Sequence, residues 1–359
     1  MPKRVIFDKK NVLVTGGAGF IGSHLCRRLL EKNKVICVDN FLTGDVKNIE
    51  SFLSNPDFVL IKADINELSD VETLPDLQRF KIQFQGIQEI YNLACPMSPA
   101  EFEKNKIQNI LVNSVGLKNL LEIAVKYQST FVQFSSSVVY GPRVQGDQKI
   151  REDNLGEVDA ISERASYDEG KRFAEAAVST YRSVYGIDAK IARIFRTYGP
   201  LMKLHDQQML PDFINNALEN KDLIIYGDNN FSSSLCYVSD VVDAVMKLAA
   251  SDIARPINIG SDSDVSLTEV AQKIINLTGS TAKIIYKDPI TFMTPLAVPD
   301  ISLAKQELGW MPVTTLDNGL KKTVDDLSAA KGLVDIKHAI WFIINLITWI
   351  YKLKRKIYF

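Results

Sequence analysis

Short runs of apolar residues alternate with longer amphipathic stretches along the first half of the chain. The short runs occupy residues 11–14, 34–38, 59–61, 89–93, 130–134 and 189–194. Because they are apolar at nearly every position, they predict strands buried on both faces. Helix-period stretches occupy residues 21–31, 107–127 and 167–185. This alternation is typical of an α/β protein built on a Rossmann-type doubly wound parallel sheet.

The elements become shorter after Gly199. Predicted helices and strands there are residues 211–218, 223–226, 238–250, 257–259, 267–278 and 283–286. A chain of 359 residues is long enough for two lobes. We therefore expect a Rossmann domain over 1–198 and a smaller α/β substrate-binding lobe over 199–330, with 230–262 returning to the Rossmann domain.

Residues 331–359 form a tail of different composition, in which the apolar segment 339–351 precedes a basic run. Its thirteen residues span about 20 Å as a helix, which is shorter than the roughly 30 Å hydrocarbon core of a bilayer. The tail therefore predicts contact with a membrane surface, with Trp341 and Trp349 at the interface. The alternative is a helix packed on the body of the protein or on another copy.

Charge and cysteine content exclude several classes of protein. A net charge of −1 argues against nucleic-acid binding, which depends on a basic excess. The four cysteines are scattered without a C-x-x-C pair, which is typical of free thiols in a reducing compartment and predicts no metal site. Residues 1–10 lack the apolar region of a secretory signal. We therefore expect a cytoplasmic protein.

The first candidate site is the glycine-rich run TGGAGFIG at residues 15–22, between a predicted strand and a predicted helix. Gly16, Gly19 and Gly22 allow the backbone to turn and to approach a pyrophosphate, which the helix N-terminus attracts. The next strand ends at Asp39, whose carboxylate can accept bonds from the ribose hydroxyls and would repel a 2′-phosphate. The run predicts NAD as cofactor; an ordinary tight turn is the alternative.

The second candidate site is Tyr167-x-x-x-Lys171 together with Ser136 at the end of a predicted strand. Residues four apart share one face of a helix, so Lys171 can lie beside the Tyr167 hydroxyl and lower its pKa. A tyrosinate can then act as a base, and the serine hydroxyl can hydrogen-bond the same substrate oxygen. A surface pair on an ordinary helix is the alternative. After the third strand, Asp64 and Ile65 are placed to border an adenine, with a helix cap as the alternative for Asp64.

These motifs together resemble the extended short-chain dehydrogenases, and among them the UDP-glucuronate decarboxylases. The resemblance covers residues 10–325 through the ordered segments VTGGAGFIGSHL, VDNFLTGDVKNI, YNLACPMSPAEFEKN, SYDEGKRFAE and ARIFRTYGP. It implies that Tyr167 is the base, Lys171 its partner and a ribose contact, and Ser136 the hydroxyl residue. Further implied cofactor contacts are Phe20, Ile21, Asn40, Phe41, Thr43 and Leu93.

The same resemblance implies a substrate, a reaction and an oligomer. The substrate is a nucleotide sugar, most readily a UDP-sugar, and Asn113 and Tyr181 contact it; a buried amide and a core aromatic are the alternatives for these two residues. NAD oxidises the sugar at C4, carbon dioxide leaves, and C4 is reduced again. Relatives pair through two long helices, here 107–127 and 167–185, so we expect a homodimer.

Several substrate-side positions depart from the decarboxylase pattern. Val138 stands where relatives carry a glutamate, and Arg196 stands at a usual asparagine. Leu201, Gln208 and Ser233 replace arginines that grip the phosphates or the sugar acid. Arg196 can supply the missing charge, or it can form an interlobe salt bridge. Three hypotheses remain: a decarboxylase, a nucleotide-sugar 4-epimerase, and a non-catalytic nucleotide-binding protein.

Overall fold

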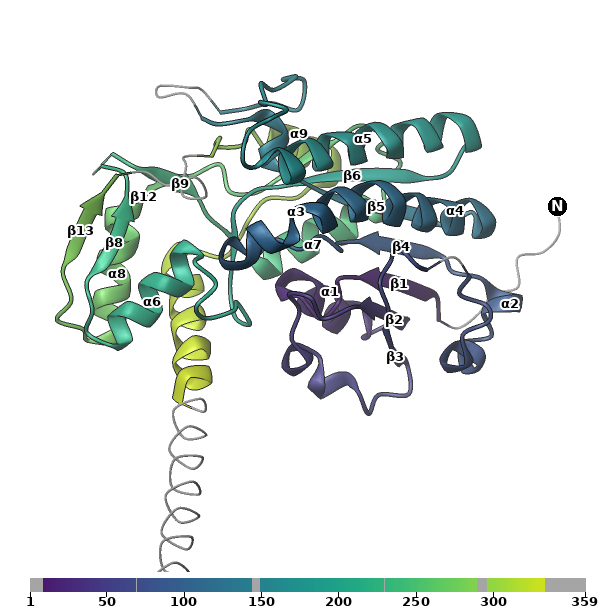
Figure 1. The fold of residues 1–359 in the computed structure, drawn as a ribbon, viewed down its shortest axis with the longest axis horizontal. Coiled ribbons are helices and arrows are strands. Elements are labelled where there is room, and N and C mark those ends of the chain that lie inside the picture. The colour runs from purple at the N-terminus through teal and green to yellow at the C-terminus, as the bar shows by residue number, and fades with distance from the viewer. Residues whose placement is uncertain (1–8, 69, 144–148, 229, 289–295, 333–359) are drawn as a thin grey trace, which may run out of the picture.

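The large lobe is built on a seven-stranded parallel sheet (Figure 1). The computed structural model describes residues 9–68, 70–143, 149–228, 230–288 and 296–332. The strands are β1 (Asn11–Thr15), β2 (Lys34–Asp39), β3 (Phe58–Lys62), β4 (Glu89–Asn92), β5 (Thr130–Ser136), β6 (Ala189–Ile194) and β11 (Ile257–Ile259). Their order is β11-β6-β5-β4-β1-β2-β3. The predicted Rossmann-type sheet is confirmed, and its strand order reverses beside β1, where such sheets bind dinucleotides.

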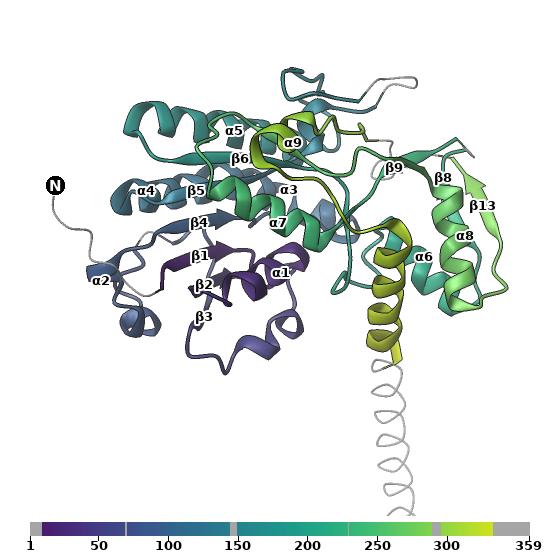
Figure 2. The same ribbon diagram turned by 180° about the vertical axis from the view of Figure 1, so that it is seen from behind.

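Helices cover both faces of this sheet because each strand is apolar on both sides. Val12 and Val14 of β1 pack in one core with α1 (Phe20–Leu29) and α7 (Val238–Ala249). The residue between them, Leu13, packs in a second core with α4 (Leu117–Tyr127) and α5 (Ala165–Tyr185). Figures 1 and 2 show these two layers from opposite sides. Helix α9 (Ser302–Leu308) contacts β11 at one edge of the sheet.

The stretch predicted as one helix over 107–127 is interrupted. Helix α3 (Phe102–Leu111) ends in a π-helical segment, Val112–Gly116, from which α4 continues. Gly116 lies against Ile65 so closely that a Cβ at this position would come within 2.7 Å of that side chain. Single π-helical turns are frequent beside functional sites, and this one packs against α5.

The smaller lobe has its own core. It contains α6 (Met209–Leu218), α8 (Leu267–Thr278) and the strand pairs β8 (Leu223–Tyr226) with β13 (Ile284–Lys287) and β9 (Ser232–Ser234) with β12 (Asp264–Ser266). Two short strands, β7 (Thr197–Tyr198) and β10 (Cys236–Tyr237), pair where the chain passes between the lobes. Residues 316–332 are helical and add Leu320, Val324 and Leu327 to this core.

The sequence predicts that the tail contacts a membrane surface. Within the residues that the structure describes, no helix is both long enough and apolar enough to cross a bilayer. The apolar segment 339–351, with Trp341 and Trp349, lies outside the described residues.

Candidate active site

A cavity of about 890 Å³ opens between the carboxyl ends of the parallel strands and the smaller lobe. Its wall joins residues far apart in the sequence, from the glycine-rich loop after β1 to the C-terminal helix. The predicted residues that line it are Gly16, Gly19, Phe20, Ile21, Gly22, Asp39, Asn40, Thr43, Asp64, Ile65, Leu93, Ser136, Tyr167, Lys171 and Arg196. The fold therefore brings both candidate sites into one cavity.

The glycine-rich loop is packed too tightly for side chains. Gly16 has a φ of +69°, and its N–H donates to the Val38 carbonyl at 2.8 Å. A Cβ on Gly22 would lie 2.1 Å from the Gly16 carbonyl oxygen, and one on Gly16 would lie 3.0 Å from the Ala94 nitrogen. Side chains are thus excluded where the first turn of α1 meets the loop. This leaves room for a pyrophosphate to approach the backbone.

Asp39 organises the ribose end of the cavity. Its carboxylate accepts hydrogen bonds from the backbone N–H groups of Ala18 at 2.9 Å and of Phe41 at 2.8 Å. Burial raises the pKa of Asp39, and the two N–H donors act in the opposite direction. Each carboxylate oxygen has a lone pair left for a ribose hydroxyl. These residues fit the adenosine half of NAD.

Phe41 does not contribute its side chain to the cavity wall that the described residues form. It adopts a positive φ of 59° and packs against the core between β1, β2 and α1. Its backbone N–H, which binds Asp39, is the part that serves the site. Asn40 donates to Asp64 at 3.2 Å, and Asp64 also accepts from the Asn66 N–H at 2.9 Å. Residues 65–67 form a turn, so Asp64 caps no helix there.

The second candidate site is assembled from β5 and α5. Tyr167 and Lys171 are both buried on α5, and Ser136 closes β5. The Lys171 Nζ donates to the Phe134 carbonyl at 2.9 Å and lies 5.8 Å from the centre of the Tyr167 ring. The ammonium group is therefore held between the strand end and the phenol.

Burial dominates the electrostatics of Tyr167. It raises the pKa of the phenol above its ordinary value, and the neighbouring Cys95 acts in the same direction. Hydrogen bonding to the Ser136 side chain opposes this effect. The lowered pKa expected from Lys171 is therefore not found: the protein alone keeps Tyr167 protonated, because removal from water disfavours the phenolate.

Asn113 is a buried, hydrogen-bonded residue in this fold. It lies in the π-helical segment, where its amide donates to the Asn109 carbonyl at 2.8 Å and to the Cys95 Sγ at 3.5 Å. A Cβ on Gly170 of α5 would meet this amide at 3.1 Å. Its amide is enclosed between two helices, which matches the alternative of a buried, hydrogen-bonded amide; the predicted substrate contact stays a prediction.

Tyr181 lies far along α5 from Tyr167. Fourteen residues separate them, which places Tyr181 about 21 Å away along the helix axis. Its ring packs against Tyr185 with centroids 5.2 Å apart. This packing matches the alternative of a core aromatic, and the predicted substrate contact stays a prediction.

Arg196 lines the cavity without the predicted interlobe salt bridge. Its Nη1 contacts the Met209 Sδ at 3.7 Å, and among the described residues no carboxylate lies within ion-pair distance. Burial and the nearby charge of Arg164 lower its pKa to about 10, so the guanidinium is charged at neutral pH.

The other departures from the decarboxylase pattern occupy different surroundings. Val138 is buried beside Phe102 and Tyr167. Leu201 and Gln208 line the cavity but carry no charge, and Ser233 is buried in β9. These positions place uncharged side chains where the resemblance implies arginines and an acid.

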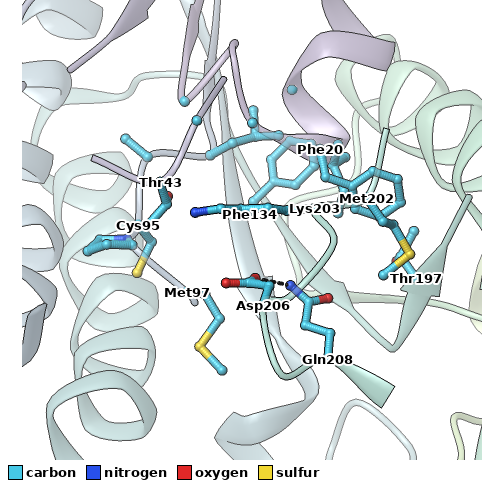
Figure 3. Close-up of a pocket in the computed structure, with 18 of the residues that line it drawn as sticks. Phe20, Thr43, Cys95, Met97, Phe134, Thr197, Met202, Lys203, Asp206 and Gln208 are labelled. Atoms are coloured by element: carbon cyan, nitrogen blue, oxygen red, sulfur yellow. Dashed lines mark hydrogen bonds between the residues drawn. The ribbon is translucent and has the colours of Figure 1, made fainter. Parts of the chain in front are cut away.

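Sequence reasoning missed a polar group on the loop between β7 and α6. Asp206 is buried, accepts a hydrogen bond from the Gln208 amide at 2.8 Å and accepts another from the Ser98 hydroxyl. Figure 3 shows Asp206 and Gln208 near Met97 in the cavity wall. Burial raises the pKa of this carboxyl. One indication was present in the sequence, because Asp206 lies between Leu201 and Gln208, two positions already assigned to the substrate side. Its hydrogen bond with Ser98 could not be predicted, because only the fold brings Ser98 beside it.

Comparison with known proteins agrees with this geometry. Residues 12–260 match the NAD dependent epimerase/dehydratase family. The chain is 36% identical over 319 residues to UDP-glucuronic acid decarboxylase 1 of Xenopus tropicalis, covering 88% of this chain and 72% of that protein. It is 37% identical over 324 residues to UDP-glucuronic acid decarboxylase 6 of Arabidopsis thaliana, covering 90% of each.

Solved structures show the same fold. One is the UDP-glucose 4-epimerase of Thermotoga maritima with UDP-glucose, at a TM-score of 0.78 and 26% identity over 89% of this chain and 99% of that one. Another is the UDP-glucuronic acid 4-epimerase of Bacillus cereus with UDP-glucuronic acid and NAD, at a TM-score of 0.77 and 27% identity over the same shares. The chain belongs to the NAD-dependent epimerase/dehydratase family of extended short-chain dehydrogenases.

Proposed function

We propose that the protein is an NAD-dependent UDP-glucuronate decarboxylase that forms UDP-xylose. The observation that carries the proposal is similarity to decarboxylases along nearly the whole chain, 90% of both proteins in one case. The cavity supports it, because Ser136, Tyr167 and Lys171 lie in the same space as the dinucleotide loop. An enzyme that oxidises and reduces one sugar carbon needs this arrangement.

Each proton movement of the reaction at C4 has a group in the cavity. Bound NAD⁺ supplies the hydride acceptor. Tyr167, once deprotonated, takes the proton of the sugar C4 hydroxyl and becomes a phenol again, and Ser136 orients that hydroxyl by a hydrogen bond. Lys171, held by the Phe134 carbonyl, places positive charge beside the phenolate that must be present before this transfer. Tyr167 later returns a proton to the same oxygen when C4 is reduced.

Decarboxylation uses the ketone formed at C4. This ketone lies β to the carboxylate, so its carbonyl accepts the electron pair when the bond to carbon dioxide breaks. The carbon that loses the carboxylate then takes up a proton. Val138 carries no acid, so this proton comes from another donor.

The test is incubation with NAD and UDP-glucuronate labelled with ¹³C in the carboxylate. We expect labelled carbon dioxide together with a UDP-pentose, and loss of both products in Tyr167→Phe. If the wild-type protein binds NAD and UDP-glucuronate but releases neither product, the decarboxylase proposal is wrong. Bound cofactor without turnover of any nucleotide sugar would support the non-catalytic alternative.

The second candidate function is a nucleotide-sugar 4-epimerase. It is favoured by Val138, because a buried valine beside Tyr167 offers no carboxyl group for proton transfer at a carbon. The solved relatives that act on UDP-glucose and UDP-glucuronic acid are 4-epimerases. A product of unchanged mass with inverted C4, identified by NMR, would establish this function in place of decarboxylation.

We also propose a homodimer formed through α3, α4 and α5. The support is the set of exposed apolar side chains on α3 and α5, including Ile107 at 67%, Phe173 at 54% and Val184 at 66% exposure. Apolar surface of this kind is commonly covered by a partner. Multi-angle light scattering should give twice the chain mass, and Phe173→Glu should shift it toward the monomer. A monomeric wild-type protein would contradict the proposal.

For cellular location, we propose a cytoplasmic protein that contacts a membrane surface through residues 339–351. The four cysteines are free thiols, as a reducing compartment requires. The basic residues after 351 suit anionic headgroups. The full chain should co-sediment with vesicles that contain phosphatidylserine and much less with neutral vesicles. Protein that stays in the supernatant with both kinds of vesicle would contradict membrane contact and support a tail packed on protein.

A further inference from the structure

The charge on Arg196 lacks a counterion within the described part of the chain. Its guanidinium lies at the start of α6, and its contact there is the soft, neutral sulfur of Met209. The charge of Arg164, which also acts on it, is positive too and lowers its pKa. Arg196 is partly buried, and a cation removed from water without a counterion is costly unless a ligand supplies the anion. This corner of the cavity is therefore prepared for an anionic group.

Arg196 lines two neighbouring spaces. On one side is the main cavity, with Tyr167 in its wall. On the other side is a cavity of about 90 Å³ whose wall includes the aromatic residues Phe213, Tyr226 and Phe231 and the amide of Asn216. Arg196 and Met209 line both spaces. A ligand that occupies both spaces must pass the guanidinium.

A nucleotide sugar has its parts in the same order as this cavity. With the sugar C4 at Tyr167, the diphosphate on C1 lies across the ring, and the base lies beyond it. The small aromatic space can hold a planar base with hydrogen bonds from an amide. The diphosphate then falls at Arg196. A sugar carboxylate, in contrast, is attached next to C4 and stays at the Tyr167 end.

We infer that Arg196 holds the diphosphate of the nucleotide-sugar substrate and replaces the arginines that the resemblance implies at Leu201, Gln208 and Ser233. The inference rests on the proposed function only in taking a nucleotide sugar as substrate. A guanidinium suits this role because its planar fork can bind two phosphate oxygens at once. Lys203, on the loop between β7 and α6, also lines the cavity. Its ammonium group is 3.7 Å from the Glu101 carboxylate, which partly neutralises it.

The experiment compares Arg196→Asn, which restores the residue usual in relatives, with Arg196→Lys and with Arg255→Asn as a matched control. Arg255 is an exposed arginine paired with Glu307 and does not line the cavity that the described residues form. Isothermal titration calorimetry measures the dissociation constants for NAD, uridine, UDP, UDP-glucose and UDP-glucuronate.

We expect Arg196→Asn to weaken UDP and both UDP-sugars by about 10- to 100-fold, the usual effect of losing charge-assisted hydrogen bonds. Binding of NAD and of uridine should not change, Arg196→Lys should lose less, and Arg255→Asn should match the wild type. If Arg196→Asn does not fold, shown by loss of NAD binding, the dissociation constants of Arg196→Lys relative to the wild type test the inference instead.

Three results would overturn the inference. The first is unchanged affinity for UDP in both Arg196 variants. The second is a loss of affinity confined to UDP-glucuronate, which would assign Arg196 to the sugar carboxylate. The third is a wild-type protein that binds none of the UDP ligands. Failure of the proposed function is distinguishable from these. A wild-type protein that binds UDP-sugars through Arg196 but releases no carbon dioxide supports this inference and refutes only the decarboxylase.

Discussion

Replacement of Gly22 by alanine tests whether the glycine-rich loop is shaped by backbone contacts. The added Cβ would lie 2.1 Å from the Gly16 carbonyl oxygen and 2.8 Å from the Gly17 Cα. Both are backbone atoms, so no side-chain rotation can relieve the clash and the loop must move. Overpacking of this kind costs about 1–3 kcal/mol, against which alanine gains about 1 kcal/mol in helix propensity. We expect a net loss of about 0–2 kcal/mol in the free energy of unfolding.

The larger effect of Gly22→Ala should fall on the cofactor. Displacing the loop misplaces the N–H groups that face the pyrophosphate, so the dissociation constant for NAD should rise by at least about tenfold. Urea unfolding and calorimetric titration with NAD measure the two effects. Gly279→Ala is the control, because Gly279 has a φ of +65° and a Cβ added there would meet no atom within 4 Å. It should cost about 1 kcal/mol of stability and leave NAD binding unchanged. Wild-type NAD affinity in Gly22→Ala would refute the reasoning.

Other predictions concern the protons of the site. Tyr167→Phe should lower the rate of C4 oxidation by at least about 100-fold while NAD still binds, measured by the appearance of NADH in single-turnover mixing. Burial raises the pKa of Tyr167, so its deprotonated fraction is small at neutral pH and grows as the pH rises. The rate of C4 oxidation should therefore increase between pH 7 and 9, and a flat profile would contradict Tyr167 as the base. Burial raises the pKa of Asp212 to about 6, so the folded protein binds more protons than the unfolded one between about pH 4 and 6. Stability should therefore fall as the pH rises through this window, by at most about 3 kcal/mol. Asp212→Asn should remove that slope in urea unfolding, and a retained slope would assign it to other groups.

The cofactor half of the site could be predicted from the sequence alone. The strand–loop–helix unit around Gly16, Gly19 and Gly22 and the aspartate at the end of β2 are local in the chain, so their spacing predicts their geometry. The parallel sheet was equally readable, because strands buried on both faces are apolar throughout. The pair Tyr167 and Lys171 needed only the helical repeat to be placed on one face.

The substrate half depended on contacts between distant segments, which no local pattern encodes. The π-helical segment places the Asn113 amide between two helices, and Tyr181 lies about 21 Å along α5 from Tyr167. Ser98 and Asp206 meet across 108 positions of sequence. Arg196 is charged in any fold, but its lack of a counterion follows from the tertiary packing that encloses it. Local sequence determined which backbone groups can bind the dinucleotide, and tertiary packing decided which side chains face the sugar, because burial and pairing depend on the whole fold.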